Sequence, residues 1–324
     1  MPVLEGTGVF QRPGEWLRCA LHAHSTVSDG DLPPSAVARQ YLTAGFDVLA
    51  ITDHWRLTTV TDVPDLVLLP AAELTADLGR VGWTADLLVY GIHDIPEDPG
   101  GDRRNWMVNT AEHWEQRTFP SVEAGALWAR AQGGVAYLAH PYWTGAGSYA
   151  FDDAPHLCGV EVFNGSAEFE GGRGDSSVLW DEALERGIRL HGIATDDSHM
   201  PLFDIELAWT WVKVTERTPE AVVAALRDGH SYSSTGPRII DLEHRSCEIE
   251  IHCSPVRSVH VTTSREHGAS VSAGRGGRRC GRILETDANG LITRAVVDYS
   301  GADATYTRVR IVDAGGQQAW TNVL

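Results

Sequence analysis

Up to about residue 235, the chain alternates short apolar runs with helix-like segments, and six of the eight apolar runs have His, Asp or Glu as their last or next-to-last residue. This alternation is typical of strand–helix units built around a mostly parallel sheet. The carboxyl ends of parallel strands in a barrel meet at one face, where such folds place their chemistry. The pattern therefore predicts an α/β fold with one polar site. The runs are LRCALHAH (17–24), DVLAITDH (47–54), LVLLPAAEL (66–74), DLLVYGIH (86–93), VAYLAHP (135–141), VEVFNG (160–165), LHGIATDD (190–197) and AWTWVKV (208–214).

Two helices are marked by clear end signals. In TPEAVVAALRDG, Thr218 is the expected N-cap, Pro219 follows it in the first turn, and Gly229 lies just beyond the end. A second helix is expected to begin at Ser121 and to stop at Gly133.

The sequence changes character after the turn-rich segment SYSSTGPR. Alternating stretches such as RSVHVTTS and TRVRIVD, separated by Gly-rich turns, predict a small antiparallel β domain without helices. We expect a first domain at residues 1–238 and a β-rich C-terminal domain at residues 239–324.

The segment LHAHSTVSDG holds the first candidate metal ligands. Residues two apart in a strand point to the same side, so His22 and His24 can present both imidazoles to one ion. Asp29 follows in a turn from which it can reach a neighbouring ion. Taken alone, an HxH pair more often caps a strand, and Asp29 would then only form an Asx-turn. The other motifs shift this balance.

Further candidates close the next apolar runs. His54 ends the run AITDH as a candidate ligand, and Asp53 could orient an imidazole from behind. Glu73 ends the run LVLLPAAEL, where a buried carboxylate is costly unless it is paired or bound to metal. His140 precedes a strand-ending Pro, and Asp197 and His199 form another pair on one side of an extended segment. A mixed set of imidazoles and carboxylates suits Zn, Mn or Fe.

Composition limits the classes of protein. Asp and Glu outnumber Lys and Arg by 44 to 26, a formal charge of −18 that disfavours stable nucleic-acid binding. A small anionic substrate remains possible because metal ions can reverse the local field. The five scattered cysteines indicate a reducing compartment, and we find no signal peptide or membrane-length apolar run. We expect a cytoplasmic enzyme.

Taken together and in order, LHAHSTVSDG, AITDH, the Glu of AAEL, LAHP, EVFNG and the DxH of TDDSH resemble the polymerase-and-histidinol-phosphatase (PHP) family. The resemblance covers roughly residues 17–238 and is closest to the stand-alone, phosphoesterase-like hydrolases of that family. It implies a distorted (β/α)7 barrel with two or three divalent ions (Mn, Zn or Fe).

The resemblance also implies a distribution of ligands. His22, His24, Glu73 and Asp197 would hold the first ion, Glu73 and His140 the second, and Asp29, His54 and His199 the third. The family often has a further His after the Glu, where this chain has Asp86 in TADLLVYG. Asp86 would then be a ligand in its place, or His93 would be if the alignment slips.

Substrate contacts are predicted from the loop NGSAEFEGGRGDSS. Arg173 can pair bidentately with phosphate oxygens, although a solvated pairing with Asp175 is an equal alternative. Ser177 begins an expected helix whose N–H groups favour an anion, and Asn164 could face the pocket. Four tryptophans are expected to pack in the core, although one could stack on a base or aryl group: Trp83, Trp106, Trp143 and Trp180.

These features predict a hydrolase that uses a metal-bound hydroxide and no protein nucleophile. The favoured substrate is a small phosphomonoester or phosphodiester, possibly a nucleotide. The alternative keeps the same metals but cleaves a carbamate, amide or carboxylic ester, and a non-catalytic metal-stabilised module is a weaker third. The G-x-S-x-G, Walker A and GxGxxG patterns are absent.

Overall fold

The computed structural model describes residues 8–79, 83–97, 100, 104–106, 114–274, 280–300 and 304–324. Within them lie six α-helices: α1 (Pro34–Thr43), α2 (Val122–Ala131), α3 (Pro141–Thr144), α4 (Gly165–Gly171), α5 (Ser177–Glu185) and α6 (Pro219–Arg227). Two short 3-10 turns, η1 (Val9–Gln11) and η2 (Ser148–Phe151), complete the helical part of the described chain.

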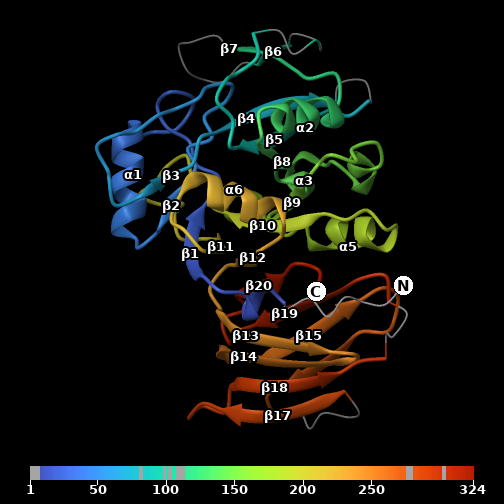
Figure 1. The fold of residues 1–324 in the computed structure, drawn as a ribbon. Helices are drawn as coiled ribbons and strands as arrows, with labels where there is room; N and C mark the ends of the chain where they lie inside the picture. Colours follow the sequence, from blue (N-terminus) through green and yellow to red (C-terminus); the bar gives the residue numbers. More distant parts are fainter. Residues whose placement is uncertain are drawn as a thin grey trace.

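The strands of the described residues form four sheets (Figure 1). The largest has the order β16 (Ala269–Ser272), β15 (Ser258–Thr263), β19 (Thr307–Val312), β20 (Gln318–Thr321), β12 (Ser231–Ser234), β11 (Trp209–Val214), β1 (Glu15–Ala20), β2 (Val48–Leu49), β3 (Val67–Leu68). The second has the order β10 (His191–Thr195), β9 (Gly159–Asn164), β8 (Val135–Leu138), β5 (Thr84–Tyr90), β4 (Ala71–Asp77). The third runs β13 (Ile239–Arg245), β14 (Glu248–Val256), β18 (Ile292–Asp298), β17 (Gly281–Thr286), and the fourth pairs β6 (Arg104–Trp106) with β7 (Trp114–Gln116).

Single bridges join the two sheets that carry the predicted ligands. Ala23, just past β1, bridges Ser198, just past β10, in parallel, and His54 bridges Glu73 of β4 in the same way. The mixed α/β prediction is confirmed. Among the described residues, the predicted barrel is not one continuous hydrogen-bonded cylinder, because only isolated bridges join the two sheets. In addition, β5 runs antiparallel to both of its neighbours.

The two helices predicted from their end signals form as α2 and α6. The Thr218 side chain accepts a hydrogen bond from the Ala221 N–H at the start of α6, and Ser121 caps α2 through the N–H of Ala124. Each cap satisfies a backbone N–H that the first helical turn leaves without a partner.

Strands alone make up the described part of residues 239–324, as the alternating pattern predicts. The sheets nevertheless cross the predicted boundary, because β20 pairs with β12, and β12 pairs with β11. The buried Arg308 of β19 also reaches α5, where its Nε and Nη2 donate to Asp181 at 2.8 and 2.6 Å. Figure 1 shows the C-terminal strands lying against one end of the remaining chain. No described helix is long and apolar enough to span a bilayer.

Candidate metal centre

The predicted ligands gather at the ends of the strands that surround the two joining bridges. His22 and His24 follow β1, His140 follows β8, and Asp197 follows β10. Glu73 differs from the prediction, because it is the third residue of β4 rather than the residue that ends a strand. Its Cα lies at the bridge to His54, so a mid-strand carboxylate still reaches the cluster.

Four donor atoms form a compact set. His22 Nε2 lies 3.2 Å from Glu73 Oε2 and 3.1 Å from Asp197 Oδ1. His24 Nε2 lies 3.2 Å from the same Glu73 oxygen and 3.3 Å from the same Asp197 oxygen. Ligand bonds of about 2.0–2.1 Å in a tetrahedron give edges of roughly 3.3–3.4 Å between donors, so these spacings fit a four-coordinate ion.

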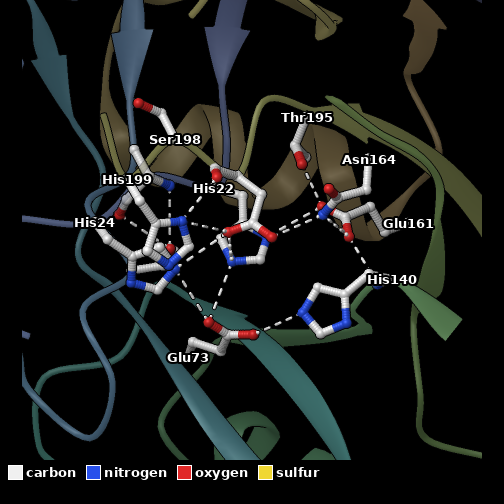
Figure 2. Close-up of polar contacts among 12 residues, drawn as sticks. His22, His24, Glu73, His140, Glu161, Asn164, Thr195, Ser198 and His199 are labelled. Carbon is white, nitrogen blue, oxygen red and sulfur yellow. Dashed lines mark hydrogen bonds and ion pairs between the residues drawn. The ribbon is translucent and has the colours of Figure 1, made fainter. Parts of the chain in front are cut away.

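The second oxygen of Glu73 faces a different imidazole. Glu73 Oε1 lies 3.2 Å from His140 Nε2, while Oε2 faces His22 and His24 (Figure 2). Asp86 offers an oxygen near Glu73 and His140, with all three ligand atoms within 4.8 Å of one another. Asp86 also accepts a hydrogen bond from Thr75. His93, the alternative to Asp86, is exposed and joins none of the described ligand groups.

Asp29 gathers the remaining predicted ligands. Its Oδ2 lies 3.4 Å from His54 Nε2 and 3.6 Å from His199 Nε2. His24 lies between this group and Glu73, with its ring stacked on that of His199 at a centroid distance of 4.2 Å. All eight predicted ligands and Asp86 therefore lie in one cluster.

Three buried polar atoms in the cluster have no hydrogen-bond partner: His24 Nε2, His140 Nδ1 and Asp197 Oδ1. Leaving buried polar atoms unpaired costs free energy, so such atoms call for an unseen partner. Two of these atoms, His24 Nε2 and Asp197 Oδ1, belong to the set of four donors described above. Lone pairs of nitrogen and oxygen that converge without hydrogen bonds fit a divalent cation.

The electrostatics of the metal-free cluster agree with this reading. Burial alone would lower the pKa of His140, but Glu73 raises it to about 9. Burial likewise opposes protonation of His199, whose pKa Asp29 raises to about 9. The pKa of the Glu73 carboxyl falls well below its usual value because His22 and His54 outweigh its burial. The buried carboxylates are therefore stabilised by nearby positive charge, which either protonated imidazoles or metal ions can supply.

Two of the predicted ligand residues have strained backbones. His140 has φ 26° and Asp197 has φ 56°, values that side chains other than glycine rarely adopt. Hydrogen bonds hold both in place: the His140 N–H donates to Glu161 Oε2 at 2.7 Å, and the Asp197 N–H to the His22 carbonyl at 3.1 Å. Strain of this kind persists where the surroundings over-determine the geometry, as they do at functional sites.

Glu161 is the important residue that the sequence pattern did not reveal. It is fully buried in β9 and accepts hydrogen bonds from the His22 Nδ1–H at 3.0 Å, the His140 N–H, the Thr195 hydroxyl and the Asn164 amide at 2.9 Å. A carboxylate only accepts, so it keeps the His22 proton on Nδ1 and leaves Nε2 free for metal. The signal was present as a lone acid within the apolar stretch GVEVFN.

Asn164 has its amide committed to the protein. Its Nδ2 donates to Glu161 and to Asp197 Oδ2 at 3.0 Å, and its Oδ1 caps α4 by accepting from the Ala167 N–H. The side chain is fully buried, so this geometry favours orientation of Asp197 over the predicted contact with substrate.

Asp53 acts on an imidazole only indirectly. Its carboxylate accepts from the Ser25 N–H and hydroxyl and from the Ser28 hydroxyl, each at 2.7 Å. Ser28 in turn lies 3.2 Å from His24 Nδ1. An orienting effect of Asp53 on the His24 imidazole would therefore act through Ser28.

Arg173 is exposed, whereas Ser177 is buried. The exposed Arg173 guanidinium sits over the ring of Tyr142 at 5.1 Å, and the Ser177 N–H donates to Asp175 Oδ1 at 2.9 Å. Asp175 thus fills one position of the helix terminus predicted to bind an anion. The predicted contacts of both residues with substrate stay predictions.

The tryptophans singled out from the sequence differ in burial. Trp180 is fully buried, as expected, whereas Trp83 and Trp143 are 45% and 43% exposed, so core packing was wrong for these two. The side chain of Trp106 lies outside the residues described.

Comparison with known proteins gives the class of fold. No family model and no curated protein matches the sequence. Among solved structures, the chain is similar to a two-domain protein from Bacteroides vulgatus described as containing a predicted PHP-like metal-dependent phosphoesterase. The TM-score is 0.51 at 15% identity, over 96% of both chains.

Two further structures show weaker similarity. An amidohydrolase from Chromobacterium violaceum is 19% identical, with a TM-score of 0.42 over 57% of this chain and 89% of that one. A lesion-specific endonuclease from Pyrococcus furiosus is 14% identical, with a TM-score of 0.46 over 66% of this chain and 56% of that one. These two are too distant to bear on function. The chain has a PHP-like fold, and the resemblance read from its motifs is confirmed at that level.

Proposed function

We propose that the chain is a divalent-metal-dependent hydrolase and, more specifically, a phosphoesterase for a small phosphomonoester or phosphodiester. One observation carries the proposal: the two oxygens of Glu73 face different imidazoles. Oε2 lies 3.2 Å from both His22 Nε2 and His24 Nε2, and Oε1 lies 3.2 Å from His140 Nε2. A carboxylate in that position suits a pair of neighbouring ions. Such a pair, when bound, lowers the pKa of water to about 7 and neutralises charge on the attacked group.

The protein's own residues would assemble the site. His22, His24, Glu73 and Asp197 would hold the first ion, and Glu73, His140 and Asp86 the second. Asp29, His54 and His199 would hold a third. Glu161 would fix the proton of His22, and Asn164 would orient Asp197, through the hydrogen bonds described above.

We propose water bound to the ions as the nucleophile, in place of a protein hydroxyl. The hydroxyls of Ser25 and Ser28 donate to Asp53, and that of Ser198 donates to Asp204 at 2.6 Å. A hydroxyl bonded to a carboxylate has the arrangement of an activated nucleophile, so these contacts do not favour water over serine. The preference for water rests on the clustered imidazoles and carboxylates, which suit divalent ions.

An anionic substrate is favoured for an electrostatic reason. The chain carries a formal charge of −18, yet a site with two or three divalent ions would be locally positive. The exposed Arg173 adds a cation beside Tyr142. A second candidate uses the same ions on an amide, carbamate or carboxylic ester, and it is favoured by the position of Arg173 over Tyr142 instead of over the cluster.

We further propose that seven strands, β1, β2, β4, β5, β8, β9 and β10, enclose the centre as a distorted barrel. The bridges that join the two sheets support this arrangement. The 1–238 and 239–324 division is retained as a proposal about domains, supported by the wholly β character of the second part.

The direct test is hydrolysis of a substrate panel by Mn- or Zn-loaded protein. We expect release of phosphate from phosphomonoesters, or of an alcohol and a phosphomonoester from phosphodiesters, and we expect His24→Ala to reduce this hydrolysis to background. His252→Ala, which alters an exposed histidine of β14, is the matched control and should keep full activity. Cleavage of amides, carbamates or carboxylic esters in place of phosphoesters would move the assignment to the second candidate. If the protein hydrolysed none of these substrate classes, with bound metal verified, both candidate functions would be refuted.

A further inference from the structure

The side of the centre nearest His140 has an exposed aromatic surface. The Trp143 ring meets the His140 ring edge-on, with centroids 5.1 Å apart and planes at 73°. Trp143 is nevertheless 43% exposed, and its neighbour Tyr142 is 42% exposed. Indole surface in water forgoes hydrophobic stabilisation, so a ring left open beside a ligand is available to a partner.

The segment that carries Trp143 is held firmly. Pro141 starts α3, the Tyr142 N–H donates to the Ser176 hydroxyl at 3.2 Å, and the Thr144 N–H returns to the His140 carbonyl at 3.2 Å. The N–H of His140 is fixed by Glu161. A ring on such a turn is positioned before anything binds, which lowers the entropic cost of recognition.

Arg173 extends this surface. Its guanidinium lies 5.1 Å from the centroid of the Tyr142 ring, in a cation–π arrangement that holds the arginine at the rim. Trp143, Tyr142 and Arg173 together form what we call the aromatic rim. Trp143 contacts His140. Figure 2 shows His140 on one side of Glu73, and His24 and His199 on the other side.

We propose that Trp143 determines substrate specificity by stacking on a planar ring in the leaving group. The inference rests on the proposed phosphoesterase function and narrows it to esters of aromatic or heteroaromatic alcohols, or of groups that carry such a ring near the scissile bond. A phosphoryl group at Glu73 and His140 would place its leaving group beside Trp143. Small alkyl esters would bind the same centre without that contact.

The experiment measures equilibrium binding of two non-hydrolysable probes to zinc-loaded protein, by calorimetry. Phenylphosphonate and methylphosphonate share the anionic group and differ in the ring. We expect the wild-type protein to bind phenylphosphonate more tightly. Trp143→Ala should weaken phenylphosphonate by about 5- to 10-fold, in line with the usual strength of aromatic stacking, and leave methylphosphonate within about 2-fold.

Two further variants make the result specific. Trp143→Phe keeps a ring and should recover most of the phenylphosphonate affinity. Ile240→Ala removes an exposed apolar side chain from β13, remote in the fold, and should change neither affinity. Metal content is measured for each variant.

The outcomes separate the two proposals. If methylphosphonate binds but the phenyl ring adds nothing, or if Trp143→Ala weakens both probes equally, the specificity role is overturned and the phosphoesterase proposal stands. If neither probe binds to the metal-loaded wild type, the phosphoesterase proposal fails and the specificity role fails with it.

Discussion

Replacing Glu161 with Gln should damage the centre without touching any proposed metal ligand. The carboxylate is fully buried and accepts four hydrogen bonds, two of them from His22 Nδ1 and the His140 N–H. Gln offers one acceptor oxygen and one NH2, so some donors must face another donor. Bonds to a charged acceptor contribute about 1.5–3 kcal/mol each, against about 0.5–1.5 for neutral pairs.

From these values we expect Glu161→Gln to lower the free energy of unfolding of the metal-free protein by about 3 kcal/mol. Metal affinity should fall by roughly 10- to 100-fold, because an NH2 group opposite His22 Nδ1 favours the tautomer with its proton on Nε2. Urea unfolding measures the first effect, and zinc competition with a chromophoric chelator measures the second. Glu250→Gln, which weakens a surface pair with Arg294, is the control and should change stability by less than about 1 kcal/mol. Wild-type zinc affinity in Glu161→Gln would refute the role assigned to this carboxylate.

Other expectations follow from the same structure. Removing metal with a chelator should lower the free energy of unfolding by about 2.7 kcal/mol, compared with protein that has free metal at 100 times its Kd. The loss would appear as a lower Tm, and an unchanged Tm would contradict a metal site in the native state. Asp181→Ala should cost about 3 kcal/mol in urea unfolding, because it leaves Arg308 buried without its partner, whereas Glu182→Ala on the same helix should cost little; equal costs would remove the special role of the pair. Burial, aided by two nearby arginines, lowers the pKa of His260 to about 4. The unfolded chain therefore binds the proton more readily, and stability contributed by the neutral ring is lost as pH falls from about 6.5 towards 4. His260→Gln should thus lose less Tm than wild type between pH 7 and pH 5, and identical losses would count against this assignment.

The clustering of the predicted ligands could be anticipated because most of them sit in a local pattern with chemical meaning. His22 and His24 are two apart, and His140 precedes a proline. These patterns place polar side chains near strand ends, but they do not specify the isolated bridges that join the two sheets at the cluster.

Glu161 could not be assigned in the same way. Its role depends on the pairing of β9 with β10, which brings Thr195 level with Asn164 after a shift in register. No local pattern specifies which strands become neighbours or where a bulge falls. An acid in an apolar strand signals only that a partner exists.

The exposure of two tryptophans and the pairing of β20 with β12 were missed for related reasons. Hydrophobic residues are usually interior, so composition favoured core packing for Trp143, while its actual exposure depends on the short helix after His140. Pairing of β20 with β12 joins residues about 85 positions apart, such as Ser234 and Ala319, and no periodicity within either strand predicts it.

Anomalous scattering from crystals of zinc- or manganese-loaded protein would test the metal centre most directly. We predict one peak bounded by His22, His24, Glu73 and Asp197 at about 2.0–2.2 Å, and a second between Glu73 and His140. Loaded crystals with no peak among these side chains would contradict the centre on which the proposed hydrolysis depends.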